Sequence, residues 1–334
     1  MRVGLVGTGR IGESHAAAVA ARAEVDELVL ADADGARARD VAGRVGAHVA
    51  GAIDTLLHPG AVDALVVTAA TSAHAELILA GVRAGIPVFC EKPVAPTVAE
   101  TVDVLREVDK RQALVHIGFM RRFDAGYAEA RRALRDGELG ELHRVHAVTC
   151  DAAPPPAEYL PTSGGLFRDC LVHDFDILRW VTGREVVEVH AYGANRGADY
   201  FAAADDVDTA AAVLRMDDGT LATVQGSRYN GGGYDVRMEL AGSAGTIAVG
   251  LDGHAALRSA EAGVDFPSQD PYREFWSRFA PAYGAEIAAF LSAVREGGPS
   301  PCTVADALEA VLVADAAERS RRAGRPVRIE EVRP

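Results

Sequence analysis

The chain has 334 residues, of which 34 are Lys or Arg and 48 are Asp or Glu, so its formal net charge is −14. This acidity disfavours a nucleic-acid binder and a protein of anionic membrane surfaces, because both need a basic face. The hydrophobic fraction of 49% and the charged fraction of 25% are ordinary for a folded chain, and the length predicts two domains.

The start of the chain, its apolar runs and its cysteines favour a cytoplasmic protein. No apolar signal segment precedes the first β-rich run, so we expect no secretion. Apolar stretches such as 64–70 are too short to cross a bilayer, so no membrane partner is expected. The four cysteines form no CxxC pair, which predicts reduced thiols rather than a zinc ribbon or a disulfide framework.

The first third of the sequence alternates between short β-rich runs and Ala-rich segments with helical spacing. The expected strands are 3–6, 28–31, 65–68, 88–90 and 114–117, and the expected helices are 13–21, 36–44, 75–84 and 98–111. Apolar strands that alternate with helices are typical of a parallel sheet covered on both faces. Residues 1–121 are therefore predicted to form an α/β domain, a doubly wound Rossmann sheet.

The pattern changes after Arg121. The expected elements are a helix at 127–134, a strand at 142–149, a proline-rich loop at 152–156, a helix at 170–181, several strands within 186–257, two helices at 275–295 and 304–322, and a strand at 326–329. Strands without intervening helices predict one large, mostly antiparallel sheet. We expect a C-terminal α+β domain at 122–300, with 301–334 packing back on the Rossmann domain.

One face of that second sheet is expected to be open. The strand at 208–216 places Ala210, Ala212, Leu214 and Met216 on one side. An apolar sheet face must be buried, which predicts a homo-oligomer, a dimer or tetramer, formed through this sheet.

A GxGxxG motif, Gly7 to Gly12, follows the first strand and opens the first helix. Gly7 allows the tight turn, Gly9 lets a pyrophosphate approach the backbone, and Gly12 lets the helix pack closely on the strand. The intervening Arg10 and Ile11 start the helix, whose unpaired N–H groups face the phosphates. The motif and its context predict a dinucleotide site.

Asp32 ends the second strand, 20 residues after Gly12. An acidic residue at this point accepts hydrogen bonds from the adenine ribose hydroxyls and repels a 2′-phosphate. No Arg follows directly, so we expect NAD rather than NADP. The alternative is that Asp32 only caps the next helix.

Lysine is rare in this sequence, since Lys92 and Lys110 are the only two among 34 cationic residues. Lys92 directly follows the strand 88–90, and ligands of open α/β sheets bind beyond the carboxyl ends of the strands. A compact ammonium group can hydrogen-bond a reacting hydroxyl and stabilise negative charge on its oxygen. Lys110 reads as a solvated charge near a helix end.

Asp169 and His173 are four residues apart, which places both on one side of a helix. A histidine can take the proton of a hydroxyl group while hydride leaves the same carbon. Asp169 can raise the His173 pKa, orient the ring, or hold a second substrate hydroxyl. The alternative is a carboxylate at the start of a helix and a half-buried histidine.

Taken together, the order of these motifs resembles the Gfo/Idh/MocA oxidoreductase family over essentially the whole chain. The resemblance includes a loop at 71–74 with Thr71 and His74, the Glu91-Lys92-Pro93 corner, and segments at 118–127 and 276–283 that are similar to inositol 2-dehydrogenases. It implies that Lys92, Asp169 and His173 are catalytic. It also implies that Thr71, His74 and Glu91 lie along the cofactor.

Residues that select the substrate are less regular. The family resemblance implies substrate contacts for Arg122 and for Tyr234 of a Tyr-Asp pair, and Asp151 can accept polyol hydroxyls or start a turn. Asp151 stands where inositol-type relatives tend to have basic or amide residues, and Ala69-Ala70 replaces a usual Thr-Pro or Ser-Pro. No metal is expected, since His143 and His146 face opposite sides of a strand.

The resulting hypothesis is an NAD-dependent dehydrogenase of a cyclic polyol or sugar, with inositol oxidised to inosose as the first guess. A different enzyme on the same frame stays open: an aldose 1-dehydrogenase, a ketose reductase, or an NAD-dependent glycosidase. A non-catalytic NAD(P)-binding sensor is the other alternative. A sensor should tolerate loss of the catalytic residues, and all three positions are intact here, which disfavours this alternative.

Overall fold

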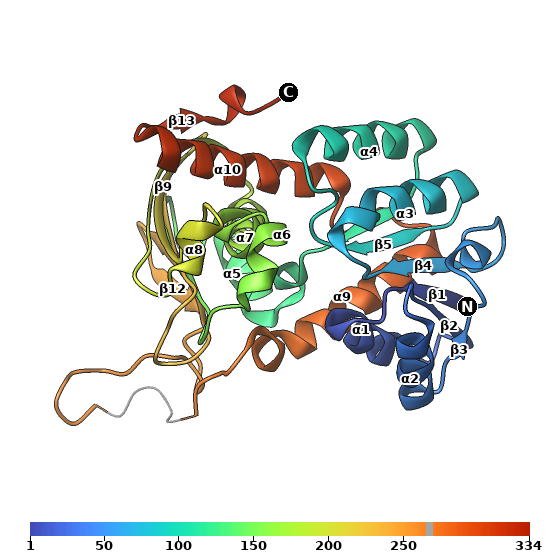
Figure 1. Ribbon diagram of the computed structural model, residues 1–334. Coiled ribbons are helices and arrows are strands. Elements are labelled where there is room, and N and C mark those ends of the chain that lie inside the picture. The colour runs from blue at the N-terminus through green and yellow to red at the C-terminus, as the bar shows by residue number, and fades with distance from the viewer. Residues whose placement is uncertain (265–269) are drawn as a thin grey trace. The chain divides into compact units, whose positions relative to one another are not determined.

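The computed structural model describes residues 1–264 and 270–334. The chain divides into two compact units, Met1–Met120 with Pro281–Glu309, and Arg121–Ala280 with Ala310–Pro334 (Figure 1). Two long helices, α9 (Phe275–Glu296) and α10 (Val304–Ala323), each contribute residues to both units. Within the described part of the chain, no helix is both long and apolar enough to cross a membrane.

The first unit contains a six-stranded parallel sheet in the order β3-β2-β1-β4-β5-β6. Its strands are β1 (Arg2–Val6), β2 (Glu27–Ala31), β3 (His48–Val49), β4 (Ala64–Val67), β5 (Val88–Glu91) and β6 (Val115–Gly118). The order reverses between β1 and β4, as in a doubly wound fold, and the ligand-binding edge lies at the carboxyl ends of these strands. The predicted parallel Rossmann sheet is confirmed.

Helices cover both faces of this sheet (Figure 1). They are α1 (Arg10–Ala20), α2 (Gly35–Val45), α3 (Thr71–Ala84) and α4 (Val98–Arg111), with a 3₁₀ turn η1 at Ile53–Leu56. Side chains of α1, α2 and the later part of α9 share one apolar core with alternate residues of β1, β2 and β4, among them Val3, Leu5, Leu30 and Phe290. Burial of these side chains stabilises the layer and fixes the strand ends that form the site.

Two local predictions in this unit were wrong. The segment 71–74 is not a loop but the first turn of α3, because the apolar spacing of His74, Leu77 and Ile78 already buries one helix face from its start. The edge strand β3 escaped prediction, since two exposed residues carry no periodic signal.

The second unit contains a seven-stranded sheet in the order β12-β11-β7-β10-β9-β8-β13. Its strands are β7 (Leu142–Cys150), β8 (Val186–Ala194), β9 (Thr209–Met216), β10 (Leu221–Ser227), β11 (Asp235–Gly242), β12 (Thr246–Val249) and β13 (Val327–Arg328). Only β7 and β10 pair in parallel, with Ala147 opposite Val224, so the predicted, mostly antiparallel sheet is confirmed.

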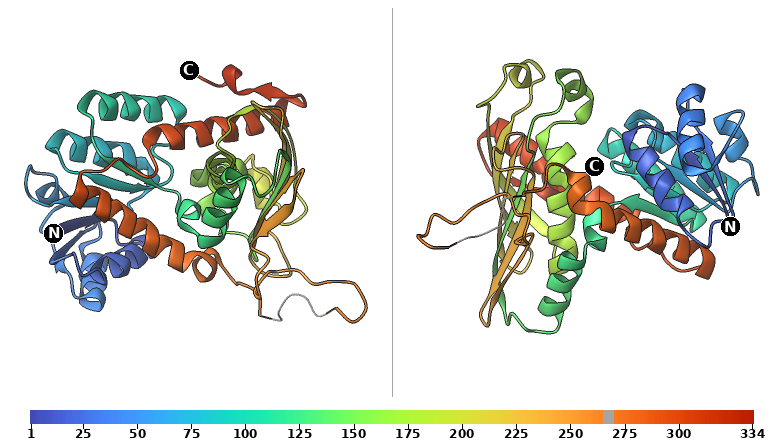
Figure 2. Two further views of the ribbon diagram at one scale, coloured as in Figure 1. Left: turned by 180° about the vertical axis from the view of Figure 1, so that it is seen from behind. Right: turned by 90° about the horizontal axis from the view of Figure 1, so that it is seen from below.

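Helices of this unit pack on one face of the sheet (Figure 2). They are α5 (Ala125–Arg135), α6 (Leu160–Ser163), α7 (Val172–Thr182), α8 (Tyr200–Ala203) and the later part of α10, with short turns η2 (Met120–Phe123), η3 (Ala157–Tyr159), η4 (Phe167–Leu171) and η5 (Ile329–Glu331). Burial alternates strictly along β9 and β10, and Val213 and Leu221 on the other face are 51% and 52% exposed.

Candidate functional site

The glycine-rich turn after β1 leaves room for a phosphate group. Gly7 has a φ of +98°, and a Cβ on Gly12 would lie 1.9 Å from the Gly7 carbonyl oxygen, so both positions require glycine. A Cβ on Gly9 would meet nothing within 4 Å, and no side chain caps the helix that Gly9 precedes. Uncapped N–H groups beside open space fit the pyrophosphate of a dinucleotide. Arg10 and Ile11 form the first turn of α1.

Asp32 lies at the carboxyl end of β2, as predicted, and its carboxylate is held on several sides. It accepts hydrogen bonds from the Thr8 N–H at 2.6 Å, the Thr8 hydroxyl at 2.9 Å and the Asp34 N–H at 2.8 Å. Arg37 donates to it at 2.7 Å. Burial alone would raise the Asp32 pKa, but the hydrogen bonds from Arg37, Thr8 and Asp34 lower it to about 2.

The cap of α2 belongs to Asp34, which accepts from the Ala36 and Arg37 N–H groups. Asp32 therefore does not cap the helix, and the alternative reading of this residue is wrong. Its ionised carboxylate fits the adenine ribose hydroxyls of NAD. A ribose hydroxyl can take the place of Arg37, whose side chain is 49% exposed.

His74 joins the segments that follow β4 and β5. Its Nδ1 lies 2.7 Å from the Pro93 carbonyl oxygen and its Nε2 lies 3.0 Å from that of Ala69. The side chain is buried in the first full turn of α3, and Thr71 begins that helix half-buried. His74 thus supports the residue next to Lys92, and its contact with the cofactor stays a prediction.

Glu91 connects Lys92 to α1, the helix that follows the glycine-rich turn. One Glu91 oxygen lies 2.7 Å from His15 Nε2 of α1, and the other accepts from the Lys92 N–H at 3.2 Å. His15 is fully buried and its ring packs near Phe89. A Cβ on Gly118 would lie 3.1 Å from the Glu91 carboxyl group, so a glycine at this position leaves room for the carboxylate. Lys92 is half-buried at the end of this chain of contacts.

In the second unit, Asp169 and His173 flank the junction between η4 and α7. Asp169 belongs to a π-helical turn, and α7 begins three residues later at Val172. The turn follows Gly165, whose φ of +85° favours glycine and whose carbonyl accepts the Asp169 N–H at 2.8 Å. Single π-helical turns occur frequently at functional sites.

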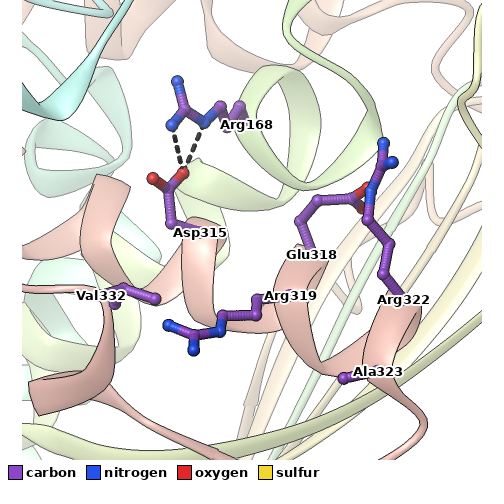
Figure 3. Close-up of a pocket in the computed structure, with 7 residues that line it drawn as sticks. All are labelled: Arg168, Asp315, Glu318, Arg319, Arg322, Ala323 and Val332. Atoms are coloured by element: carbon purple, nitrogen blue, oxygen red, sulfur yellow. Dashed lines mark hydrogen bonds and ion pairs between the residues drawn. The ribbon is translucent and has the colours of Figure 1, made fainter.

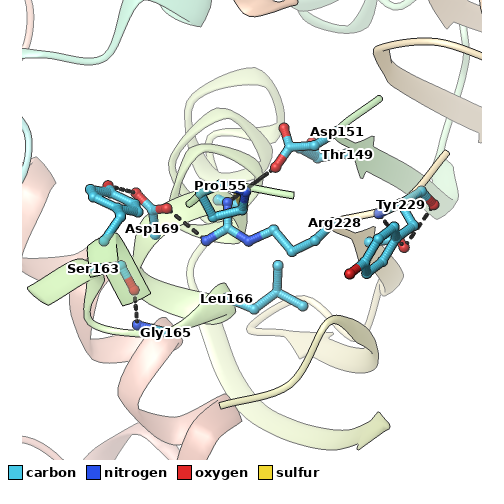
Figure 4. A network of polar contacts seen from close by, with 12 residues as sticks. Thr149, Asp151, Pro155, Ser163, Gly165, Leu166, Asp169, Arg228 and Tyr229 are labelled. Carbon is cyan, nitrogen blue, oxygen red and sulfur yellow. Dashed lines mark hydrogen bonds and ion pairs between the residues drawn. The ribbon is translucent and has the colours of Figure 1, made fainter. Parts of the chain in front are cut away.

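Asp151 and Asp169 meet at one buried arginine, Arg228 (Figure 4). The guanidinium donates to Asp169 Oδ2 at 2.6 Å and to Asp151 Oδ2 at 3.1 Å. It also lies 2.7 Å from the Cys170 sulfur. The second Asp169 oxygen accepts from the Tyr159 hydroxyl at 3.0 Å. The structure thus brings together two of the predicted residues through two that sequence reasoning missed.

Burial and charge act in opposite directions in this polar cluster, which we define as Asp151, Tyr159, Asp169, Cys170 and Arg228. Burial raises the pKa of Asp151, although Arg228 opposes the shift. Burial and the Asp169 charge raise the Tyr159 pKa, so the phenol stays a donor. Burial alone would lower the Arg228 pKa, but the surrounding acidic groups raise it. The cluster therefore presents a permanent cation between acceptor groups.

Arg121 and Arg122 form two buried ion pairs with aspartates of α7. Arg121 donates to Asp174 at 2.8 Å, and Arg122 makes two bonds to Asp176 at 2.6 and 2.9 Å. Both guanidiniums support the helix that carries His173, and contact of Arg122 with substrate stays a prediction. Tyr234 lies just before β11, is 6% exposed, and has its pKa raised by burial.

A shallow pocket elsewhere in the second unit has a charged lining (Figure 3). Arg168, the neighbour of Asp169, pairs there with Asp315 of α10, and this ion pair connects η4 to α10. Glu318 of the same lining binds Arg321 and Arg322. The carboxylates of this pocket are paired with arginines, and none of the predicted site residues lines it. Across residues 1–264 and 270–334, no cluster of three or more His, Cys, Asp or Glu side chains could hold a metal.

Two residues that were not predicted, Arg228 and Arg37, could have been recognised from the sequence pattern. Alternation along β10 places Arg228 on the same face as the buried Val224 and Gly226. Arg37 lies one turn into α2, close in sequence to Asp32. Tyr159 and His15 could not, because their partners are brought near only by the fold.

Comparisons with known proteins cover both units of the chain. Residues 1–119 match an oxidoreductase family with an NAD-binding Rossmann fold, and residues 127–248 match the GFO/IDH/MocA C-terminal domain. The chain is 39% identical to the myo-inositol dehydrogenase Hyg17 of Streptomyces leeuwenhoekii, over 97% of this chain and 98% of that one.

Solved structures give the same result. A myo-inositol dehydrogenase of Corynebacterium glutamicum superposes with a TM-score of 0.90 at 33% identity, over 98% of both chains. A scyllo-inositol dehydrogenase of Lactobacillus casei, solved with NAD(H) and scyllo-inositol, superposes with a TM-score of 0.87 at 26% identity, over 99% of both chains.

Proposed function

Because the chain belongs to the Gfo/Idh/MocA oxidoreductase family, whose N-terminal domain binds NAD, we propose that it oxidises one secondary hydroxyl group of a cyclic polyol to the ketone, with inositol as the first candidate. The observation that carries the proposal is the buried polar cluster around Arg228, in which two carboxylates, one of them four residues before His173, converge on one guanidinium. Such an arrangement suits a neutral ligand rich in hydroxyl groups, because carboxylates accept hydrogen bonds from them.

Each catalytic residue has a defined task in this proposal. Bound NAD supplies, at its nicotinamide C4, the acceptor for the hydride that leaves the hydroxyl-bearing carbon. His173 takes the proton of that hydroxyl, and Lys92 donates a hydrogen bond that stabilises negative charge developing on its oxygen. Asp169, with its carboxylate held by Arg228 and Tyr159, supports His173 electrostatically.

The NAD preference follows from the first unit. Gly9 leaves open space at the start of α1, and Asp32 presents an ionised carboxylate beside it. That negative charge disfavours a 2′-phosphate, so NADP is the weaker cofactor.

The direct test mixes purified protein with NAD and a panel of inositols, aldoses and other cyclic polyols, and follows absorbance of the reduced nicotinamide. Turnover of an inositol supports the proposal. Turnover only of an aldose, or only of a ketose with reduced cofactor, favours the aldose 1-dehydrogenase or the ketose reductase, and release of an aglycone favours the glycosidase. NAD binding without turnover on the whole panel favours a sensor.

We also propose that the protein is a cytoplasmic homo-oligomer, a dimer or tetramer formed through the exposed face of the second sheet. Val213 and Leu221 on adjacent strands β9 and β10 support this, since an apolar sheet face gains by being covered. None of the four cysteines, all of which lie in the described part of the chain, forms a disulfide, which suits a reducing compartment. Light scattering of the purified protein tests the oligomer, and Val213→Asp should shift it toward smaller species.

A further inference from the structure

The residue directly after β10 is a buried arginine, Arg228, whose effect on the two carboxylates goes beyond a single contact with Asp169. Arg228 continues the inward alternation of Val224 and Gly226, and its N–H donates to the Asp208 carbonyl at 2.7 Å. Its side chain is only 4% exposed. An arginine is buried this deeply only where charged partners replace its water.

Arg228 fixes the direction of both carboxylates. Its two terminal nitrogens bond separately, Nη2 to Asp169 and Nη1 to Asp151. Tyr159 binds the remaining oxygen of Asp169, so neither oxygen of that carboxylate can rotate away without breaking a bond. A lysine could not make the same forked contact, because its ammonium is a single point charge.

Arg228 also balances charge. Asp151 comes from the end of β7 and Asp169 from η4, and burial together with the charge of Asp169 raises the pKa of Asp151, which Arg228 opposes. The titratable and charged groups described around the two carboxylates are Tyr159 from η3, Cys170 from η4, Arg228 itself, Cys150 at the end of β7 and Tyr234 before β11. Arg228 is the cation among them.

We propose that Arg228 is a positioning residue for the reaction: it holds the carboxylates of Asp169 and Asp151 in fixed directions, aimed at the hydroxyl groups of a neutral cyclic polyol. Without Arg228, the two carboxylates would lose the donor that they share and could rotate, and Asp169 would no longer support His173. The inference rests on the proposed function for the identity of the substrate, but not for the contacts themselves.

The experiment compares Arg228→Met and Arg228→Lys with a control, Arg184→Met, which removes an exposed arginine paired with Asp218 at 3.1 Å. Each variant is examined for thermal unfolding, NAD binding by calorimetry, and kcat and KM across pH with the polyol that the wild-type protein turns over. We expect Arg228→Met to bind NAD normally and to lose about 100-fold or more in kcat/KM. Arg228→Lys should recover part of that loss, and the control should match the wild type.

Two readouts separate positioning from simple structural support. The acid limb of the kcat/KM profile should move to higher pH by about one unit in Arg228→Met, because its carboxylates take up protons more readily. Adding Asp151→Asn to Arg228→Met should raise kcat/KM by about fivefold or more, since it removes the repulsion that the arginine balanced. An unmoved profile, or a further loss in the double variant, would overturn the inference.

Failure of the proposed function is distinguishable from failure of this inference. If the wild-type protein oxidises no polyol, the proposed function is wrong. Carbon NMR titration of the aspartate carboxyl groups, in the wild type and in Arg228→Met, then still tests the inference. Unchanged titration of the two carboxyl groups in the variant would refute it.

Discussion

The preference for NAD over NADP can be tested at Asp32, whose carboxylate sits where the adenine ribose is expected. We predict that Asp32→Ala moves selectivity toward NADP. The substitution removes the negative charge that opposes a 2′-phosphate. It also releases the half-exposed Arg37, which Asp32 now holds at 2.7 Å. Arginine binds phosphate through two parallel hydrogen bonds, so the released side chain becomes a phosphate ligand.

The size of the effect follows from charge and hydrogen bonding. Two unit charges about 4 Å apart interact by about 4 kcal/mol at an effective dielectric constant of about 20, and exposure and salt reduce this to about 1–2 kcal/mol. A lost hydrogen bond from ribose to a charged carboxylate costs about 1.5–3 kcal/mol of NAD binding. Together these contributions amount to about 2.5–5 kcal/mol and predict that the ratio of kcat/KM for NADP to that for NAD rises by about 60- to 4,000-fold.

The assay measures kcat/KM for both cofactors at one ionic strength, with the same polyol. Asp34→Ala is the matched control, because it removes an equal charge two residues away together with a helix cap. The control should cost about 1 kcal/mol of stability and leave cofactor selectivity within about fivefold. An Asp32→Ala protein that keeps the wild-type selectivity would refute the reasoning about this carboxylate.

Three further predictions concern stability and the cofactor turn. The Asp32 pKa of about 2 lies below its ordinary value of 3.8, so the ionised carboxylate stabilises the folded protein above pH 4, and this stabilisation is lost as the pH falls toward 2. In denaturant titrations across that range, the free energy of unfolding of the wild type should fall by about 1–2 kcal/mol more than that of Asp32→Asn. Asp174→Asn leaves Arg121 buried without its ionic partner and should cost about 3–5 kcal/mol of unfolding free energy, whereas Arg184→Met should change it by less than about 0.5 kcal/mol. Gly9→Ala should keep the melting temperature but weaken NAD binding about tenfold or more in calorimetry, because the added Cβ contacts no protein atom and occupies the space expected for the phosphates. Gly12→Ala should lose both stability and NAD binding, because its Cβ would clash with the Gly7 carbonyl oxygen.

The first unit could be predicted largely from the sequence because its signals are local. The strand, the glycine turn and the helix that follows lie within 20 residues, and the structure gives a steric reason for Gly7 and Gly12, such as the 1.9 Å contact of a Cβ on Gly12. Asp32 likewise follows its strand directly. What the sequence missed here, His15 against Glu91, joins residues 76 positions apart.

The second unit depends more on contacts between distant segments. Asp169 and His173 were visible through their spacing, but Arg228 reaches Asp169 across 59 positions and Asp151 across 77. The π-helical turn at η4 was not predictable, since its residues have the same apolar spacing as an α-helix. The division of α9 and α10 between the two units could not be predicted either, because the helical spacing of each sequence continues without a break across the point of division.

Turnover of the preferred polyol by Lys92→Arg tests the central claim most directly, because this substitution keeps the charge and changes only the shape and acidity of the group. The other lysine provides the control, since Lys110 is 74% exposed near the end of α4. We predict that Lys92→Arg lowers kcat about 100-fold or more while NAD binding persists, and that Lys110→Arg matches the wild type. Full turnover by Lys92→Arg would contradict the role of this ammonium group in oxidising the hydroxyl.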